Sequence, residues 1–542
     1  MPGFNLADLF ERVVDAVPDR EVVVSPTRRL TFGELDARAN ALAHVLTDLG
    51  VTGGDHIGLQ LLNGSEYLEG MLAAFKISAV PVNVNFRYVE GELRHLYDDA
   101  DLVAVIYHRQ FAPRVAAAVD GAATVKHLLC VDDESDATSP ADAVNYETAL
   151  GAADTSRPDG SRRVGDDHYI AYTGGTTGLP KGVVWRQEDI FFAAMGGGDP
   201  FQSGNFITNP DELPTRISEV GGTILTIPPL MHVSAQWGVY HQMFSGNRIV
   251  FGPQGGFDAD VILSLIATEG VNILTIVGDA MAQPLADAIE TAQQAGEPYD
   301  LASLIVIGSG GAVLSTAAKQ RIARLLPNIM VVDGFGSSET GIVGSKLHSN
   351  DDTATAPTFT VNAQTQVLDE GGKPVVPGSG QVGRLARKGH VPLGYYKDEA
   401  KTKTTFLEVD GERWVLPGDN ATVDEDGTVV LLGRGSTSIN TGGEKVYPEE
   451  VETALKASPD VADVVVVGLP DERWGQRVVA VVAPAPGATP SLDGLREHAR
   501  TALAGYKLPR ELILVDTVER TPAGKADYTW AKATAEAKST TA

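Results

Sequence analysis

Hydrophobic and polar residues change period repeatedly along the first part of the chain. Residues 31–50 begin with Thr31 and Glu34 in capping-box spacing, continue with apolar residues on one helical face and end at Gly50. Apolar runs at 56–62, 80–85 and 102–107 predict strands, and helical patterns separate them. Such strand–helix alternation predicts parallel sheets covered by helices.

The pattern changes twice further along the chain. The runs 271–278 and 301–314 end at glycines, where open α/β sheets tend to bind ligands. From about residue 365 to Arg434, Asp-Gly and Gly-Gly turns predict hairpin-rich β structure. Beyond Arg434, helix and strand patterns predict a compact α+β unit, with a low-complexity, frayed tail from residue 531.

The predicted fold class is therefore α/β with two domains of unequal size. Residues 1–434 are expected to form a large N-terminal domain of helix-covered mixed sheets plus a β-rich subdomain. Residues 435–542 are expected to form a small, mobile α+β C-terminal domain.

Charge and cysteine content exclude several functional classes. A formal net charge of −28 argues against a nucleic-acid-binding face or a polybasic membrane anchor. The single cysteine, Cys130, lies in an apolar run, so neither an intrachain disulfide nor a cysteine-based zinc site is expected. The sequence has no signal-peptide pattern and no apolar run near the roughly 18 residues of a membrane span, which predicts a cytoplasmic protein without an integral membrane segment.

One glycine-rich segment, "YTGGTTGLPKGVVW" at 172–185, has the chemistry of an anion-binding loop. It is not a Walker A loop, because Lys181 is followed by glycine, and adjacent Gly174 and Gly175 do not fit the dinucleotide fingerprint. Its backbone N–H groups, threonine hydroxyls and Lys181 could nevertheless converge on phosphate. On this loop alone, a flexible surface turn stays open as the alternative.

Four further motifs follow in order: "GFGSSETG" (334–341), "PGD" (417–419), "LGRGSTSINTGGEKVYPEEVE" (432–452) and "TPAGKADY" (521–528). Together with the loop, this series resembles the acyl-adenylate-forming superfamily, which contains acyl-CoA synthetases, luciferases and peptide-synthetase adenylation domains. The resemblance runs along nearly the whole chain. It implies ATP, Mg²⁺ and CoA as cofactor and co-substrates, with a carboxylic acid joined first to AMP and then to CoA.

The resemblance also implies roles for individual residues. Lys525 would bridge the α-phosphate and the substrate carboxylate, Glu339 and Thr173 would hold Mg²⁺, and His232 would position substrates rather than act as a general base. Taken singly, these residues have ordinary alternatives, such as a surface lysine for Lys525 or a helix cap for Glu339. The implied ATP and AMP contacts are Thr173, Gly174, Gly175, Thr176, Thr177, Gly178, Lys181, Gly310, Gly311, Ala312, Asp333, Gly334, Phe335, Gly336, Ser337, Ser338, Asp419 and Arg434.

Two other sets of residues follow from the same resemblance. The acyl pocket would be lined by His232, Val233, Trp237, Gly308, Gly310 and Gly336. CoA would contact Thr441, Gly442, Gly443, Trp474, Lys507 and Arg510.

Three positions depart from the usual family pattern. Gly174 stands where the loop commonly has serine, and Phe335 replaces a frequent tyrosine but keeps an aromatic face. At the hinge, Gly435 and Ser436 replace the usual acidic pair or lysine, which puts in doubt the bias of domain alternation.

Several segments, including "NVNFRYVEGELRHLYDDAD" (83–101), look most like the actinobacterial branch that activates long-chain fatty acids and steroid side-chain carboxylates. A large apolar carboxylate is therefore the predicted substrate. A medium-chain or aryl acid is the alternative, as is an acyl-AMP ligase that delivers to a carrier protein, although the chain ends soon after Lys525 and a carrier domain in cis is not expected.

Two hypotheses from other classes are weaker. The intact Lys525, Glu339 and Asp419 speak against a non-catalytic nucleotide-binding relative, and the missing Gly-Lys-Ser/Thr speaks against a kinase. The expected partners are small molecules, with no nucleic acid, and a homodimer is compatible with the sequence.

Overall fold

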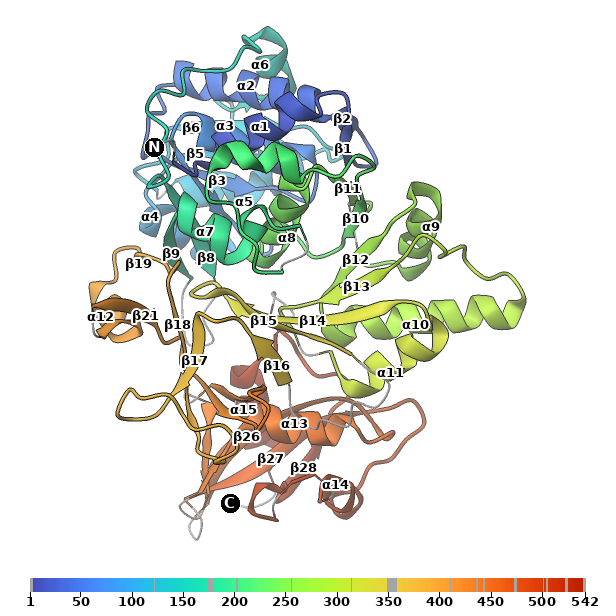
Figure 1. The fold of residues 1–542 in the computed structure, drawn as a ribbon. Coiled ribbons are helices and arrows are strands. Elements are labelled where there is room, and N and C mark those ends of the chain that lie inside the picture. The colour runs from blue at the N-terminus through green and yellow to red at the C-terminus, as the bar shows by residue number, and fades with distance from the viewer. Residues whose placement is uncertain are drawn as a thin grey trace.

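A computed structural model describes residues 3–539 apart from 121, 174–179, 201–202, 255, 313, 349–357, 410, 435–436, 442–443, 472–474, 501, 504 and 522–524. Within these described residues the strands form three sheets of 15, 8 and 5 strands (Figure 1). No helix in this described part is both long enough and apolar enough to cross a membrane.

The eight-stranded sheet contains most of the first predicted strands. Its core strands are parallel and fully buried, as expected for apolar runs covered on both faces. The glycine-rich segment closes an antiparallel hairpin at one side of this sheet. The order is β19 (Gly394–Tyr395), β9 (Lys181–Arg186), β8 (His168–Thr173), β4 (Val80–Asn83), β3 (His56–Gln60), β5 (Leu102–His108), β6 (His127–Val131) and β7 (Val144–Asn145).

The longest sheet joins a parallel half to an antiparallel half. Strands β1 and β10 to β14 are parallel, so their carboxyl ends share one edge. The order is β2 (Arg29–Thr31), β1 (Glu21–Val24), β11 (Arg248–Phe251), β10 (Thr223–Thr226), β12 (Ile273–Ile276), β13 (Val306–Ser309), β14 (Met330–Ser337), β15 (Gly341–Leu347), β16 (Thr358–Val361), β23 (Val429–Arg434), β22 (Asp419–Val423), β18 (Gly383–Lys388), β21 (Glu412–Val415) and β20 (Phe406–Val409), with β17 (Thr365–Leu368) beside β18.

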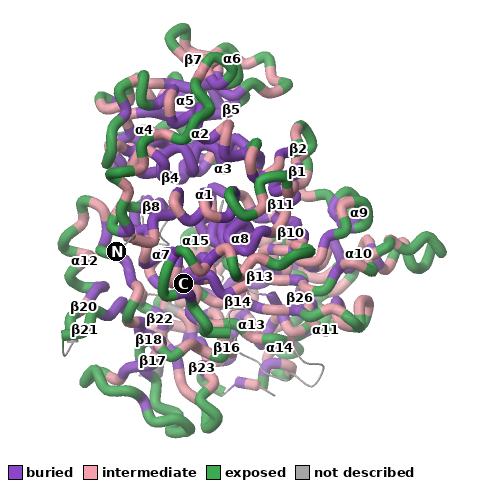
Figure 2. The backbone as a smooth tube through the Cα atoms, turned by 45° about the horizontal axis from the view of Figure 1, so that its top comes forward, coloured by how far each residue is buried: buried purple, intermediate pink, exposed green. Residues whose placement is uncertain are grey.

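Helices α3 and α4 separate the first strands as the pattern predicts, and the helix predicted at residues 31–50 is present as α2. Thr31 and Glu34 form the expected capping box, and Gly50 follows the end of that helix with φ 91°. Figure 2 shows the deepest burial in the strands and helices around β4, β8, α1 and α3. The helices are α1 (Leu6–Ala16), α2 (Phe32–Asp48), α3 (Ser65–Lys76), α4 (Glu90–Asp99), α5 (Ala112–Val119), α6 (Tyr146–Ala152), α7 (Gln187–Ala194), α8 (Val233–Phe244), α9 (Ala259–Glu269), α10 (Gly278–Ala295), α11 (Thr316–Leu325) and α12 (Glu399–Thr405).

The smallest sheet begins after Arg434 and belongs to the C-terminal part of the chain, at the lower end of Figure 1. Its strands are β25 (Glu444–Val446), β24 (Ile439–Thr441), β27 (Gly475–Pro484) and β26 (Val461–Asp471), with β28 (Glu511–Leu514) beside β27. Three helices accompany it: α13 (Pro448–Lys456), α14 (Leu492–Ala499) and α15 (Tyr528–Lys538).

The prediction of a frayed tail from residue 531 was wrong for residues 531–538, which belong to helix α15. Asp527 caps α15 by accepting a hydrogen bond from the Trp530 N–H, and Ala531 and Ala535 are fully buried against the small sheet. Small residues at an i, i+4 spacing let the helix approach the sheet closely, so tertiary packing orders a segment of low complexity.

Lys76 ties the first three helices together. Its side chain is fully buried, and its ammonium group donates to Glu11 of α1 at 2.6 Å and to Asp36 of α2 at 2.7 Å. Both carboxylates also bind an arginine, Arg163 on Glu11 and Arg157 on Asp36. A buried charge is tolerated only when it is paired in this way.

Lys76→Met is therefore expected to destabilise the N-terminal domain by about 3–5 kcal/mol, because it leaves buried carboxylates without the ammonium group. Urea unfolding followed by far-UV circular dichroism measures this change. Lys403→Met is the control, since the Lys403–Glu399 pair is exposed and should contribute about 0.5 kcal/mol or less. A Lys76→Met protein as stable as the control would contradict this account of the core.

Candidate active site

The glycine-rich segment lies at the end of a hairpin. Thr173 is the last residue of β8 and pairs with Lys181, the first residue of β9. The Lys181 ammonium donates to Asp398 at 2.5 Å. The predicted phosphate contacts Gly174, Gly175, Thr176, Thr177 and Gly178 lie outside the described residues.

A turn between β14 and β15 carries Ser338 and Glu339. The Tyr395 hydroxyl donates to the Glu339 carboxylate at 2.8 Å, and the Trp185 indole N–H donates to the Ser338 carbonyl at 2.9 Å. Arg387, which is 4% exposed, donates to the backbone carbonyls of Thr340 and Ile342. Burial lowers the pKa of Arg387 to about 10, so it stays charged at neutral pH while it holds this turn.

Open space lies beside two of the predicted pocket glycines. Among the described residues, a Cβ atom added at Gly308 would meet only the Leu274 carbonyl oxygen, at 4.0 Å, and one at Gly310 only the Gly334 carbonyl oxygen, at 3.6 Å. At Gly336, by contrast, a Cβ would lie 2.2 Å from the Gly341 carbonyl oxygen. Gly308 and Gly310 could therefore border a ligand, whereas Gly336 is required for close strand packing.

The other predicted nucleotide contacts lie on or next to the same strands. Gly311, with φ 81°, and Ala312 follow β13. Phe335 in β14 packs against Phe359, with 5.2 Å between the ring centroids. The Asp333 carboxylate accepts a hydrogen bond from Lys319 at 2.7 Å, so a side chain of the fold already engages it. Ser337 donates its backbone N–H to the Thr340 hydroxyl within the turn.

Antiparallel pairing brings two of the predicted ATP and AMP contacts, Asp419 and Arg434, together. Asp419 in β22 lies directly opposite Arg434 in β23, although 14 other residues separate them in the sequence. Asp419 is buried. The strands therefore place both residues at one point of the sheet, as the motif series predicts.

His232 precedes α8, and Val233 and Trp237 are buried on that helix. Burial, together with the positive charges of Arg87 and Lys525, lowers the pKa of His232 to about 4. The imidazole is consequently neutral at pH 7.

Lys525 itself closes a short turn. Its backbone N–H donates to the Thr521 hydroxyl at 3.2 Å, and its carbonyl accepts from the Thr521 N–H at 2.9 Å. The residues between them lie outside the described part of the chain.

The predicted CoA contacts are less closely grouped in the described residues. Lys507 donates to Glu450 at 2.5 Å, the Arg510 backbone N–H donates to the Val478 carbonyl, and Thr441 is buried in β24. Gly442, Gly443 and Trp474 are not among the described residues, and neither are the hinge residues Gly435 and Ser436.

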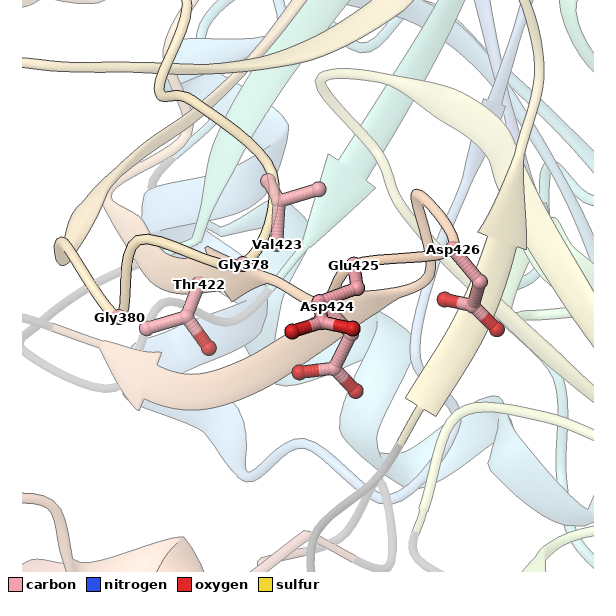
Figure 3. A pocket seen from close by; sticks show the side chains of 7 residues that line it. All are labelled: Gly378, Gly380, Thr422, Val423, Asp424, Glu425 and Asp426. Carbon is pink, nitrogen blue, oxygen red and sulfur yellow. The ribbon is translucent and has the colours of Figure 1, made fainter.

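The described residues contain no cluster of three or more metal-binding side chains. Mg²⁺ does not need such a cluster, because it is commonly held by one or two carboxylates, substrate phosphates and water. Glu339 and the Thr173 hydroxyl fit that donor set. The pocket in Figure 3 is not a candidate site for ATP. Asp424, Glu425 and Asp426 line it, and their negative charges would repel a polyphosphate.

Sequence reasoning missed the residues that hold the site from outside the motifs. Tyr395 and Asp398 contact the predicted residues Glu339 and Lys181, and Arg387 binds backbone carbonyls beside Glu339. Trp185, which ends the glycine-rich segment but was given no role, binds the Ser338 carbonyl. The "GYYKD" segment at 394–398 has no periodic signal that would have pointed to these contacts.

Comparisons with known proteins agree with this geometry. The model of the AMP-binding enzyme family matches residues 10–396, and that of the AMP-binding enzyme C-terminal domain matches residues 450–525. The chain is 46% identical to a 3-oxocholest-4-en-26-oate–CoA ligase of Rhodococcus rhodochrous, over 98% of this chain and 96% of that protein. It is 47% identical to a medium/long-chain-fatty-acid–CoA/3-oxocholest-4-en-26-oate–CoA ligase of Mycobacterium marinum, over 99% and 97%.

Solved structures show the same architecture. The anthranilate CoA ligase AuaEII in complex with anthranoyl-AMP superposes with a TM-score of 0.84 at 23% identity, covering 98% of both chains. ATP-bound MatB from Rhodopseudomonas palustris superposes with a TM-score of 0.82 at 25% identity, covering 98% of this chain and 99% of that one. The predicted fold class is thus confirmed, and the chain belongs to the family of AMP-binding, adenylate-forming enzymes.

Proposed function

We propose that the protein is an ATP-dependent acyl-CoA ligase whose substrate is a large apolar carboxylic acid, a long-chain fatty acid or a steroid side-chain acid. In the first step a carboxylate oxygen attacks the α-phosphorus of ATP. The bond between the α-phosphorus and the oxygen that bridges it to the β-phosphorus breaks, and pyrophosphate leaves. In the second step the CoA thiol attacks the acyl carbon, gives up its proton to solvent, and AMP leaves. The relatives named above support this substrate class.

The observation that carries the proposal is that the fold brings separate motifs together: Thr173 pairs with Lys181, Tyr395 binds Glu339, and Asp419 pairs with Arg434. Negative charge gathers on the α-phosphate as the carboxylate attacks, and a cation held there stabilises it. The Lys525 ammonium supplies that charge, while Lys181 and the loop after β8 bind the departing pyrophosphate. The Asp419 carboxylate accepts hydrogen bonds from the ribose hydroxyls, and the Phe335 ring stacks on the adenine.

Glu339 and Thr173 would hold Mg²⁺, which when bound neutralises charge on the phosphates. Val233, Trp237 and the open side of Gly308 and Gly310 would receive the acyl group. His232, being neutral, fills the space between acyl group and nucleotide without adding charge.

The second step needs the C-terminal domain to rotate, so that Lys525 moves away from the α-phosphate and a channel for CoA forms. We place the pivot at Gly435 and Ser436, and the domain boundary at 434/435, because β23 ends in the large sheet and β24 begins the small one. Thr441, Lys507 and Arg510 would then meet CoA, with Lys507 exchanging Glu450 for a phosphate. A cytoplasmic location and a homodimer stay predictions from the sequence.

Lys525→Ala should lower the rate of adenylation roughly 10²–10³-fold, because it removes a cation from the transition state. Acid-dependent pyrophosphate release measures this rate. Lys532→Ala on the exposed face of α15 is the matched control and should leave it unchanged. Undiminished acyl-AMP formation by Lys525→Ala would refute the role of this lysine.

The pH dependence separates a positioning His232 from a general base. With a pKa of about 4, His232 is neutral from pH 5.5 to 8 and gains a proton only as the pH falls towards 4, where its new charge would face Lys525. His232→Asn should lower adenylation by roughly 10- to 100-fold through misplacement of substrate. Logarithmic pH–rate profiles of variant and wild type should run parallel from pH 5.5 to 8; loss of a titrating limb in the variant would indicate a general base.

Gly308→Val tests the acyl pocket. Because no side chain in the described part of the chain lies within 4 Å of the added Cβ, the strand should tolerate the change while the pocket loses volume. The ratio of kcat/KM for a steroid acid to that for octanoate should fall roughly tenfold or more. An unchanged ratio, with the variant folded as judged by its Tm, would place the acyl group elsewhere.

A further inference from the structure

A short segment, Gly394–Asp398, lies between the two groups of residues assigned to the phosphates and the metal. At one end the Tyr395 hydroxyl donates to Glu339 Oε1 at 2.8 Å. At the other end the Asp398 carboxylate accepts from the Lys181 ammonium at 2.5 Å. One stretch of five residues therefore contacts both the carboxylate and the lysine of the proposed site.

This segment is attached firmly to the hairpin that carries the phosphate loop. β19 pairs with β9, and the Tyr396 N–H donates to the Gly182 carbonyl at 2.8 Å. The Tyr395 N–H donates to the hydroxyl of Thr402, in the middle of α12, at 2.9 Å. The backbone position of Tyr395 is thus set by strand pairing and by a helix turn.

The ring of Tyr395 is held as well. It is 8% exposed, lies edge-on to Phe406 with 5.8 Å between centroids, and has the Lys401 ammonium over its face at 4.4 Å. A buried ring with contacts on face and edge has little rotamer freedom. Its hydroxyl group therefore points to a fixed place.

We propose that Tyr395 is a positioning residue for the metal site: its hydroxyl group orients the Glu339 carboxylate for binding Mg²⁺ with ATP. The inference rests on the proposed function, which assigns the metal to Glu339. The bond engages Oε1 and leaves Oε2 for the metal. Trp185 and Arg387 bind backbone carbonyls of the same turn, whereas Tyr395 binds the carboxylate itself.

The energetic reason is the freedom of an unrestrained carboxylate. Glutamate has three side-chain torsions, and ordering them at the moment of metal binding costs free energy. A hydrogen bond made beforehand removes that cost, and loss of such outer partners typically weakens metal affinity 10- to 100-fold.

The neighbouring tyrosine offers a matched control. The Tyr396 hydroxyl donates to the Asp101 carboxylate at 2.8 Å, and the Lys397 ammonium pairs with the same carboxylate at 2.6 Å. Tyr396→Phe therefore removes one hydroxyl–carboxylate bond from the same segment without touching Glu339.

The test measures metal binding directly rather than turnover. Mn²⁺ is titrated into each protein in the presence of α,β-methylene-ATP, which is not cleaved at the reacting bond, and free Mn²⁺ is followed by electron paramagnetic resonance. Tyr395→Phe is expected to raise the Kd for Mn²⁺ in this complex about tenfold. Tyr396→Phe is expected to stay within twofold of wild type, and Glu339→Gln to lose most of the binding.

The outcomes separate the two levels of inference. If Glu339→Gln weakens Mn²⁺ binding but Tyr395→Phe does not, Glu339 holds the metal and the positioning role of Tyr395 is wrong. If Glu339→Gln binds Mn²⁺ like wild type, the metal assignment itself is wrong, and the positioning role fails with it. Equal weakening by Tyr395→Phe and Tyr396→Phe would mean that the segment acts only through its general stability, which also overturns the proposal.

Discussion

Two anions must meet for this protein to act as proposed, a carboxylate and a triphosphate, in a chain whose formal net charge is −28. Nearly every feature of the candidate site helps to offset the repulsion between these two anions. Cations for the candidate site come from distant parts of the sequence: Lys181 begins β9, and the charges of Arg87 and Lys525 both act on His232. Because local charge decides the field at a reacting atom, an acidic chain can still hold a strongly cationic pocket.

The sheets make this arrangement possible. Parallel strands β10, β13 and β14 end at one edge, so residues at or after their ends, including His232, Gly310 and Ser337, come from separate motifs to the same edge of the sheet. Antiparallel pairing does the same for Asp419 and Arg434. The motif residues are therefore far apart in the sequence but close together in the folded chain.

A good part of this could be predicted from the sequence. Local signals were sufficient for the capping box at Thr31 and for the change to hairpins before Arg434, since each depends on neighbouring residues. The order of the motifs was sufficient for the family. Side-chain roles within the site, including those of Lys525 and Glu339, follow from the resemblance and stay predictions.

The contacts that hold the site could not be predicted in this way. Tyr395 and Glu339 are 56 residues apart, and Lys181 and Asp398 are 217 apart, so no periodicity along the chain links them. The order of α15 was missed for a related reason, because the burial of Ala531 depends on a sheet strand some sixty residues earlier in the chain. Only the fold brings such partners together.

The central claim is that this chain joins a large apolar acid to CoA through an acyl-adenylate. Mass spectrometry after incubation with ATP, Mg²⁺, CoA and a panel of acids, from short aliphatic to steroidal, tests it most directly. The account predicts AMP together with a long-chain or steroid acyl-CoA in equal amounts. Formation of ADP, or of AMP with an acyl-adenylate that never passes to CoA, would contradict it.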